Sequence, residues 1–499
     1  MRLKFLCDAC GISYEASMED REIASIAMDS RRVTEGGLFV CIRGLHTDGH
    51  EYIDTAIASG ATCILTEQGV DCKKNDGIIH LSCANTRETA ARLFDAWYGF
   101  PTRRLKLIGV TGTNGKTSVT HMLRAILESS LCKCGLIGTV GCESAGRYLE
   151  NRAQDALANM TTPDPPELYR MLAEMLEDGV EYVLMEVTSH ALALGKLAPM
   201  EFEAAIFTNL TPEHLDFHGD MKHYAEAKAT LFEKSRLSVI NIDDRYAAQM
   251  IAATKGRAVT CSIRREADYY AEPIENGTEA GITYKLISEN GAVRIRCPIP
   301  GKFSTMNSMQ AAALALELGF PARAVQDALA SLSGIKGRME RVRLGLGADF
   351  TVLIDYAHTP DALENLLRTA RELTPRGGRV TVLFGCGGDR DRSKRPLMGR
   401  IASENADCVI LTSDNSRSED PRDIISQIRS GISPEKEVTV IENRKDAIEY
   451  AVRNAKKDDV LLLAGKGHEE YEIDREGKHP FCEKQIVQDV FRERRRDQN

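Results

Sequence analysis

The chain has 499 residues, and because domains usually run to roughly 100–200 residues, three domains are expected. Apolar residues make up 43% and charged residues 27%, which is the composition of a globular protein with large cores. The formal net charge of -9 argues against a nucleic acid as the main partner. We find neither a signal peptide at the N-terminus nor an apolar run approaching roughly 18 residues, so we expect a cytoplasmic protein with no membrane partner.

The 14 cysteines are scattered and lack the two close pairs, or the pair with spaced histidines, that a zinc site needs. We therefore expect free thiols in a reducing compartment. The first segment, residues 1–103, has the pattern of a small α/β domain. It contains a strand at 38–42 and a helix that begins at Thr86 and runs toward Trp97, and Gly99 and Pro101 then break the pattern.

The second segment, residues 104–335, begins with an apolar strand at 105–110, a glycine-rich turn and a helix at 118–130. Further buried strands are predicted at 182–185, 204–207 and 237–240. Their alternation with helices predicts a mostly parallel, P-loop-type sheet flanked by helices on both faces. Residues 265–300 alternate between polar and apolar and predict an antiparallel excursion, which is followed by a helix at 307–318.

After a linker at 334–337 the strand–helix rhythm restarts in the third segment, residues 336–499, which predicts a Rossmann-like α/β domain. Its strands are expected at 351–354, 380–384, 408–411 and 460–464. Ligands of open α/β sheets bind at the carboxyl ends of the strands. The residues that follow these strands are therefore expected to face one cleft: Asp355, Gly385, Thr412 to Asp414, and Gly465.

The strongest motif lies between the first strand and first helix of the second segment, and its residues are Gly112, Thr113, Asn114, Gly115, Lys116, Thr117 and Ser118. Glycines let backbone N–H groups curl around phosphate oxygens, a lysine supplies charge, and a threonine hydroxyl can hold Mg²⁺. The match to the common P-loop is incomplete because Val110 stands where the first glycine would fall. A glycine turn with an incidental lysine is the alternative, and the strand–loop–helix context disfavours it.

A phosphate loop needs an acid to hold Mg²⁺, and Glu186 at the end of the strand 182–185 is the best candidate. An acid in this position can also be a solvated loop residue. The polar segment 209–218 follows another strand, and its His214 or His218 could bind a metal because a neutral imidazole is a metal ligand.

Several motifs taken together resemble the Mur ligase family over essentially the whole chain. They are Gly112 to Thr117, Glu186 to His190, Asn209 to His218, Asp355 to Pro360, and Gly465 to Glu469. The resemblance is strongest to the members that add the third peptide residue of the peptidoglycan precursor. It implies an ATP-dependent, ADP-forming ligase for cell-wall synthesis, cell shape and cell division, acting as a monomer.

The implied reaction activates the γ-carboxylate of D-glutamate in UDP-N-acetylmuramoyl-L-alanyl-D-glutamate as an acyl phosphate, which an amine attacks to form an amide. Phosphorylation is needed because a free carboxylate has oxide as its leaving group, and Mg²⁺ with Lys116 neutralises the charge that gathers there. At the positions that match the family, the resemblance implies that Thr117 and Glu186 hold one Mg²⁺ and that Glu186 and His214 hold a second. From the sequence alone Lys228 is predicted to be a solvated helix residue. The resemblance matches it to a lysine that the family carbamylates, which turns a repelling ammonium into an oxygen ligand.

The resemblance also places the substrates. The nucleotide positions beyond the phosphate loop are Asn307, Arg338, Asp355 and His358. The positions for the UDP-muramoyl dipeptide are Ser30, Leu45, His46, Thr47, Thr161, Thr162, Thr188 and Lys196. Thr188 stands where serine is frequent, and Lys196 replaces a frequent arginine, which keeps the charge but loses the bidentate fork.

The amino-acid positions are Arg390, Asp414, Asn415, Ser416, Arg417, Gly465 and Glu469. The family uses mainly meso-diaminopimelate or L-lysine, which differ by one carboxylate, and an arginine fork suits that group. Asp414 to Arg417 match the diaminopimelate motif, except that Ser416 replaces its usual proline. We therefore expect diaminopimelate, with lysine as the alternative. Read without the resemblance, Arg417 would form a salt bridge with Glu419 or Asp420.

Other readings fit less well. A folylpolyglutamate-synthase-like ligase would share the phosphate loop but should lack the Asp414–Arg417 element and the turn at 29–31. A regulatory GTPase needs an Asn-Lys-x-Asp guanine reader, which Asn241 to Asp244 do not provide. A dinucleotide oxidoreductase would need glycine at position 390, where Arg390 stands. A non-catalytic binding module is weakest, because the candidate metal and phosphate groups are intact.

Overall fold

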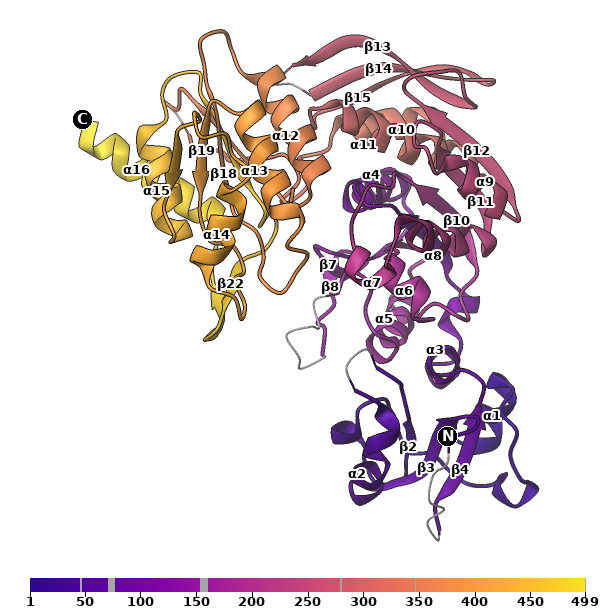
Figure 1. Ribbon diagram of the computed structural model, residues 1–499. Helices are drawn as coiled ribbons and strands as arrows, with labels where there is room; N and C mark the ends of the chain where they lie inside the picture. Colours follow the sequence, from indigo (N-terminus) through magenta and orange to yellow (C-terminus); the bar gives the residue numbers. More distant parts are fainter. Residues whose placement is uncertain (45–46, 71–76, 153–159, 279–280, 346, 499) are drawn as a thin grey trace.

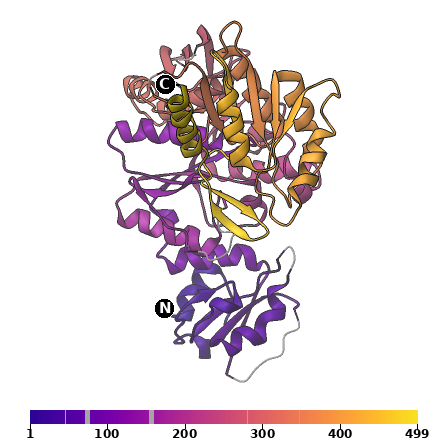
Figure 2. The ribbon, with the colours of Figure 1, turned by 90° about the vertical axis from the view of Figure 1, so that its left-hand side faces the viewer.

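The computed structural model describes residues 1–44, 47–70, 77–152, 160–278, 281–345 and 347–498. Three α/β units follow one another along the chain, each built on its own sheet (Figure 1). Figure 2 shows the N-terminal unit set apart at one end, while the central and C-terminal units lie together. The expected α/β fold with three domains and mostly parallel sheets is confirmed.

The N-terminal unit is a four-stranded parallel sheet in the order β1-β2-β3-β4. Helix α3 follows the predicted bounds because the side chain of Asn85 caps it, accepting from the backbone N–H groups of Arg87 and Glu88. Helix α3 also packs against α5 of the central unit, which joins the two units. The elements are α1 (Leu3–Cys10), β1 (Ile26–Ala27), β2 (Gly37–Val40), α2 (Ile53–Ala58), β3 (Ala61–Glu67), β4 (Ile79–Cys83) and α3 (Thr86–Trp97).

The central unit holds an eleven-stranded sheet in the order β15-β14-β13-β12-β11-β10-β5-β9-β6-β7-β8. The strands from β13 to β6 are parallel, and antiparallel pairs extend the sheet at both ends. The expected antiparallel excursion is thus confirmed as β13, β14 and β15. The strands are β5 (Lys106–Thr111), β6 (Cys134–Gly138), β7 (Gly141–Ser144), β8 (Arg147–Tyr148), β9 (Tyr182–Glu186), β10 (Phe202–Phe207), β11 (Ser235–Asn241), β12 (Arg257–Ser262), β13 (Tyr269–Thr278), β14 (Gly281–Ser288) and β15 (Gly291–Cys297).

Two central helices position the nucleotide loop. Helix α4 buries the predicted apolar stripe from Val119 to Leu127 against the sheet, so its first turn is fixed. Helix α10 begins at Lys302 rather than at the expected residue 307, because its first turn contains the buried polar Ser304, which interrupts the apolar period. The helices are α4 (Lys116–Ser129), α5 (Pro165–Glu177), α6 (Ser189–Ala193), α7 (Leu215–His218), α8 (Met221–Glu233), α9 (Ala247–Ala253), α10 (Lys302–Glu317) and α11 (Ala322–Ala330).

The C-terminal unit has a six-stranded sheet in the order β16-β17-β21-β18-β19-β20, in which the edge strand β16 alone is antiparallel to its neighbour. One apolar core runs from α4 and α10 into this unit, so the two units pack as neighbours. The elements are β16 (Glu340–Arg341), β17 (Thr351–Asp355), α12 (Pro360–Leu373), β18 (Val380–Phe384), α13 (Lys394–Asn405), β19 (Cys408–Leu411), α14 (Pro421–Arg429), β20 (Val438–Val440), α15 (Arg444–Asn454), β21 (Val460–Ala464), β22 (Tyr471–Asp474), β23 (Gly477–Pro480) and α16 (Glu483–Gln498).

The strand ends of this sheet meet as expected. The N–H of Gly465 donates to the carbonyl of Asp355 at 3.0 Å, and the N–H of Thr412 donates to the carbonyl of Phe384 at 3.1 Å. In the described part of the chain no helix is long and apolar enough to cross a membrane. The cysteines that the structure describes are not in disulfide bonds, whereas Cys72 lies outside those residues.

Candidate functional site

The phosphate loop connects β5 to α4, and two of its positions require glycine. Gly112 has φ +149°, and a Cβ on it would lie 1.9 Å from the hydroxyl oxygen of Thr208. Gly115 has φ +89° and lies against the side chain of Asn307 on α10. The N–H groups of Thr113 and Asn114 donate to the backbone and side-chain oxygens of Asn209, each at 2.9 Å. The loop is therefore held in one shape by backbone contacts and close packing.

Lys116 begins helix α4, and its ammonium lies over the loop rather than in solvent. Its Nζ donates to the carbonyls of Gly112 at 2.9 Å and Thr113 at 2.8 Å. Burial lowers its pKa from the ordinary lysine value. The hydroxyl-bearing Thr117 and Ser118 follow in the first helical turn and are also buried. The start of α4 thus combines a lysine, a hydroxyl pair and the positive end of a helix, which is the expected phosphate site.

Glu186 lies at the carboxyl end of β9, next to the phosphate loop, and it is almost completely buried. Its Oε2 accepts from the hydroxyl of Thr117 at 3.0 Å and from that of Thr139 at 2.8 Å, while Oε1 accepts from the N–H of Thr139 at 2.9 Å. Among the described residues no Lys, Arg or His nitrogen lies within 4.0 Å of this carboxylate. A buried carboxylate with neutral partners is a place where a cation lowers the free energy. Carboxylate and hydroxyl oxygens fit Mg²⁺.

Lys228 on α8 is buried beneath the same loop. Its Nζ donates to the carbonyl of Gly112 at 3.0 Å and to the hydroxyl of Thr111 at 3.4 Å. Burial, and then the neighbouring Lys116, lower the pKa of Lys228 well below its ordinary value. The sequence alone predicts a solvated helix residue here, and the structure contradicts that interpretation because α8 packs its Lys228 face against β5.

His214 has a left-handed backbone, with φ +57°, and burial lowers its pKa to about 4, so its ring is neutral. Its ring lies edge-on against that of His190, with centroids 4.7 Å apart, and its Nε2 is 3.6 Å from Glu213. No hydrogen bond joins it to Glu186 or Lys228 in the described part of the chain. His218 is engaged elsewhere, since its Nε2 lies 2.9 Å from the hydroxyl of Ser189.

The candidate acceptor hydroxyls form a cluster beside Glu186. The hydroxyl of Thr161 lies 3.0 Å from that of Thr139, and the hydroxyl of Thr162 donates to the carbonyl of Glu186 at 2.8 Å. Thr188 lies 3.2 Å from Thr162 through its hydroxyl. These side chains therefore meet at the end of β9, although they come from three loops.

The other acceptor candidates lie farther along. Lys196 is buried and pairs with Asp164, with Nζ and Oδ1 2.7 Å apart. Ser30 is buried in the N-terminal unit, where Asp29 caps its turn by accepting from the N–H of Arg31. Thr47 is exposed on the same unit. Leu45 and His46 lie outside the described residues.

The C-terminal unit contacts the phosphate loop directly. Arg338 donates from Nη2 to the hydroxyl of Thr117 at 3.1 Å, and its guanidinium lies over the ring of Tyr356. His358 Nε2 lies 3.1 Å from Glu213 Oε1. Asp355 accepts from the N–H groups of Met339 and Ala357, and burial raises its pKa. Of the predicted nucleotide residues, Arg338 and Asn307 therefore contact the loop itself, whereas the contacts of Asp355 and His358 lie beside it.

The Asp414–Arg417 segment follows β19. Asn415 is held at both ends of its amide, which donates to Glu469 at 2.7 Å and accepts from Lys466 at 2.9 Å. Although burial opposes it, Lys466 and then Arg444 lower the pKa of Asp414. Burial raises the pKa of Glu469. Asp414 also lies against Gly465, where a Cβ would come within 2.6 Å of its carboxylate, so that position needs glycine.

Arg417 is half-buried and does not pair with the acids that follow it. Its Nη1 donates to the carbonyls of Gly388 at 2.8 Å and Asn415 at 3.3 Å. Within the described residues its Nε and Nη2 make no hydrogen bond, so this edge of the guanidinium can take a carboxylate in bidentate fashion. The salt bridge to Glu419 or Asp420 is absent from the described structure because Glu419 pairs with Arg392 and Arg395 instead. Burial lowers the pKa of Arg390, and the positive charge of the nearby Arg417 lowers it further.

Family models match three stretches of the chain. Residues 22–98 match "Mur ligase family, catalytic domain", residues 110–315 match "Mur ligase middle domain", and residues 337–467 match "Mur ligase, glutamate ligase domain". A UDP-N-acetylmuramoyl-L-alanyl-D-glutamate–2,6-diaminopimelate ligase of Caldanaerobacter subterraneus is 43% identical over 474 residues, which is 95% of each chain. The chain belongs to the Mur ligase family. It is an ATP-dependent, ADP-forming ligase, as the members of that family are.

Further relatives of this Mur ligase agree. An enzyme of the same name from Geobacillus thermodenitrificans is 40% identical and covers 95% of this chain and 96% of its own. A solved structure with that name shares 31% identity, covers 99% of this chain and 100% of its own, and superposes with a TM-score of 0.68. A Mycobacterium tuberculosis folylpolyglutamate synthase shares 20% identity, covers 76% of this chain and 92% of its own, and has a TM-score of 0.62, which shows likeness of fold alone.

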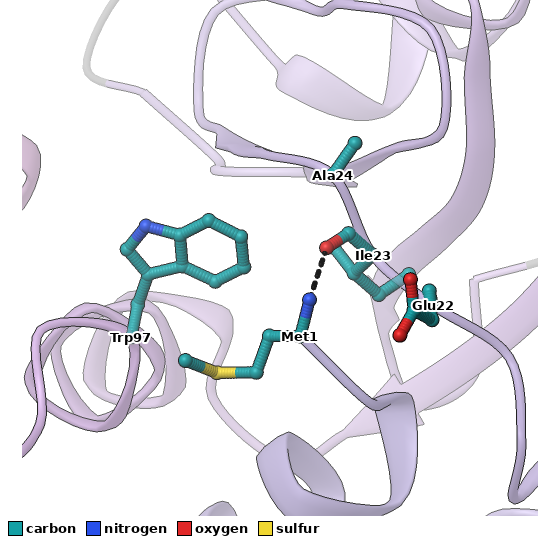
Figure 3. A pocket seen from close by; sticks show the side chains of 5 residues that line it. All are labelled: Met1, Glu22, Ile23, Ala24 and Trp97. Carbon is teal, nitrogen blue, oxygen red and sulfur yellow. Dashed lines mark hydrogen bonds between the residues drawn. The ribbon is translucent and has the colours of Figure 1, made fainter.

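Two cavities of this Mur ligase lie outside the predicted site. One, of about 600 Å³, is in the N-terminal unit between Met1, residues 22–24 and Trp97 (Figure 3). The close-up shows the Met1 amine donating to the carbonyl of Ile23, at 2.8 Å. The other, of about 740 Å³, lies by β12 and β13 near Arg257 and Glu317, which pair at 2.7 Å. Neither is lined by a residue of the predicted site.

Sequence reasoning missed three residues that contact the predicted site. Thr139 holds Glu186, Asp361 accepts from the Asn114 amide at 3.0 Å, and Glu213 meets His358. Thr139 follows the apolar run 134–138, so its place at a strand end was a usable signal. Asp361 offered none, because its partner is 247 residues away.

Proposed function

We propose that this Mur ligase joins meso-2,6-diaminopimelate to the D-glutamate γ-carboxylate of UDP-N-acetylmuramoyl-L-alanyl-D-glutamate with hydrolysis of ATP. The proposal rests on the side chain of Arg417. Its Nη1 is fixed by hydrogen bonds, while its Nε–Nη2 edge stays open beside Asn415 and Glu469. The names of the relatives at 40–43% identity support it. The product belongs to peptidoglycan precursor synthesis.

The first half-reaction transfers the γ-phosphoryl group of ATP to the acceptor carboxylate. The N–H groups of the loop from Gly112 to Thr117 cradle the phosphates, and Lys116 neutralises charge on the transferring group. Arg338 and His358 reach this site from the C-terminal unit, and Asn307 lies at the base of the loop. Closing both units around the nucleotide excludes water, which protects the acyl phosphate from hydrolysis.

Family members use Mg²⁺, and the donor set here fits that ion. We propose that Thr117 and Glu186 hold one Mg²⁺ and that Glu186 and His214 hold another. When bound, Mg²⁺ would supply positive charge against the phosphate oxygens. Thr139 keeps the Glu186 carboxylate oriented through its two hydrogen bonds.

We further propose that Lys228 carries a carbamate. Its amine is buried among neutral oxygens, and the lowered pKa favours the unprotonated form that reacts with CO₂. Carbamylation forms an N–C bond between Nζ and the carbon of CO₂ and releases one proton. The new carboxylate would add oxygen ligands beside Lys116 and His214.

The acceptor is proposed to extend from the Thr161, Thr162 and Thr188 hydroxyls toward the N-terminal unit. Lys196 provides a buried cation for its peptide carboxylates, while Ser30, Thr47 and the undescribed Leu45 and His46 belong to the UDP end. The proposed division is residues 1–103 for the UDP-sugar, 104–335 for ATP and 336–499 for the amino acid.

In the second half-reaction the amine of diaminopimelate attacks the acyl carbon, and the tetrahedral intermediate expels phosphate. Arg417 and Arg390 bind the far carboxylate, which lysine lacks, while Asp414, Asn415, Ser416, Gly465 and Glu469 surround the rest of the amino acid. Glu469 supplies a negative charge against its ammonium. The enzyme is proposed to act as a cytoplasmic monomer without nucleic-acid or membrane partners.

An isotope experiment tests this proposal. The enzyme is given ATP, Mg²⁺, meso-diaminopimelate and acceptor labelled with ¹⁸O in both γ-carboxylate oxygens. We expect a product whose mass is the sum of acceptor and amino acid less one labelled water, and inorganic phosphate that carries one ¹⁸O. Unlabelled phosphate, or phosphate release without a joined product, would contradict it.

A further inference from the structure

A charged side chain outside the predicted site lies fully buried beside the amino-acid loops. Arg395 is in the first turn of α13, and its side chain has 0% exposure. An arginine is rarely buried without partners that match its charge and donors. Its contacts therefore indicate what the side chain is for.

Both terminal nitrogens of Arg395 are saturated. Nη1 donates to Glu419 Oε2 at 2.9 Å and Gln427 Oε1 at 2.8 Å. Nη2 donates to Glu419 Oε1 at 2.9 Å and to the carbonyl of Gly387 at 3.1 Å. The guanidinium therefore binds both carboxylate oxygens of Glu419, and it joins the loop after β18 to the loop after β19.

Glu419 extends the connection to the loop that carries Arg390. Its Oε1 accepts from the N–H of Asp389 at 2.7 Å. The Asp389 carboxylate in turn accepts from the hydroxyl of Ser418 at 2.6 Å and from its N–H at 3.2 Å. Each loop thus both donates hydrogen bonds to the other and accepts them from it, immediately beside Arg390 and Arg417.

Both loops hold a strained residue at this point. Asp389 has φ +53° and Arg417 has φ +51°, the left-handed region that ordinary side chains avoid. Such conformations are unfavourable for ordinary side chains and persist where the surroundings over-determine them. The Gly388 N–H donates to the carbonyl of Asn415 at 2.9 Å, and Gly388 accepts from Arg417, so the strained residues are bound to each other's loops.

We propose that Arg395 and Glu419 are positioning residues that hold the guanidinium groups of Arg417 and Arg390 in the orientation that reads the far carboxylate of the incoming amino acid. The inference rests on the proposed function, since it assigns a task within that site. A pair that merely joined α13 to α14 would need no contact with the Gly387–Asp389 loop. A buried ion pair is also a costly way to join two helices, because both charges lose their hydration.

The test is a steady-state comparison of all three substrates, measured as phosphate release. In Arg395→Met we expect the KM for meso-diaminopimelate to rise roughly tenfold or more, because a misplaced recognition group costs binding steeply. The KM values for ATP and for the UDP-muramoyl dipeptide stay within about twofold, since no contact of Arg395 reaches them. Selectivity for diaminopimelate over L-lysine falls by the same factor, and Arg395→Lys restores part of it.

Two further variants keep the test decisive if Arg395→Met does not fold. Glu419→Gln keeps the shape but removes the charge, and Ser418→Ala removes one exposed hydrogen bond at the far end of the connection. Both should raise the diaminopimelate KM in the same direction, by smaller factors. Arg379→Gln is the matched control, because it breaks an Arg–Asp pair to Asp459 at the opposite end of the same sheet.

Folded variants whose KM for diaminopimelate is unchanged, or in which all three KM values rise alike, would overturn the inference. Wild-type enzyme that does not use diaminopimelate at all would instead overturn the proposed function. The two failures are therefore separable in one set of assays.

Discussion

The phosphate loop and the proposed amino-acid site are built in opposite ways. The loop is one continuous stretch, Gly112 to Thr117, whose shape comes from backbone bonds and from glycines that have no room for a Cβ. The amino-acid site gathers side chains that follow β18, β19 and β21, and side-chain hydrogen bonds such as Asn415 to Glu469 hold them together. The first arrangement is formed by residues that are adjacent in the sequence, and the second by residues that only folding brings together.

This difference predicts how each region fails. Changes in the loop should remove chemistry for every amino acid, because they act on the phosphoryl group that all substrates need. Changes in the amino-acid site should alter selectivity while leaving ATP binding intact. Four variants test whether the two regions fail in these different ways.

The largest effect is expected for Lys116→Ala. Its ammonium lies over the loop, and removing a preorganised charge from a phosphoryl-transfer site costs about 10²–10³-fold in kcat or more. Phosphate release at saturating substrates measures it. Lys133→Ala, which loses only a surface contact to the carbonyl of Asp178, is the control. Activity near wild type in Lys116→Ala would remove this loop from the site.

A large effect is also expected for Gly112→Ala. Its Cβ would lie 1.9 Å from Thr208 Oγ1, so the loop must move, and displacing reacting groups by about 1 Å costs roughly 10²-fold. Gly99→Ala is the control, because Gly99 also has a positive φ, +76°, but no atom lies within 4 Å of the added Cβ. Turnover and the thermal midpoint of both variants are compared. Equal loss of turnover would mean that backbone strain, and not the shape of the loop, matters.

Arg417→Ala should weaken diaminopimelate far more than ATP. Losing charge-assisted hydrogen bonds of about 1.5–3 kcal/mol corresponds to a rise in KM of roughly 10–100-fold. The KM for ATP should stay within about twofold, since the side-chain hydrogen bonds of Arg417 end at Gly388 and Asn415. Equal losses for both substrates would exclude Arg417 from recognising the amino acid.

The smallest effect is expected for Ser416→Pro, which restores the proline usual in the diaminopimelate motif. In the described part of the chain the N–H of Ser416 makes no hydrogen bond, so its removal costs little. We expect KM for diaminopimelate within about threefold of wild type. A loss comparable with that of Arg417→Ala would mean that this loop needs the freedom of serine.

The contrast also explains what could be read from the sequence. The strand, loop and helix around Lys116 were predicted because apolar period and glycine spacing are local signals. The strand ends at Asp355 and Gly465 were placed in one cleft because parallel strands share a carboxyl edge. The burial of Lys228 was not predicted from the helix pattern, since it depends on what α8 packs against.

Long-range partners were beyond local reasoning. Arg395 sits in a charged stretch, 391–395, that resembles a solvated surface, and its burial follows only from the meeting of two loops with α14. Arg417 was open to a salt bridge with Glu419 because the two are neighbours in sequence. In the folded chain Glu419 forms its ion pair with Arg395 instead, and this leaves Arg417 available for a ligand.

The most direct test of the proposed function measures phosphate release from ATP with the UDP-muramoyl dipeptide present, and compares meso-diaminopimelate with L-lysine as the amine. We expect release with diaminopimelate and little with lysine, because only diaminopimelate has a far carboxylate for Arg417 to bind. Release with lysine alone would keep the ligase and contradict the assigned amino acid. Release with neither would contradict the assigned acceptor.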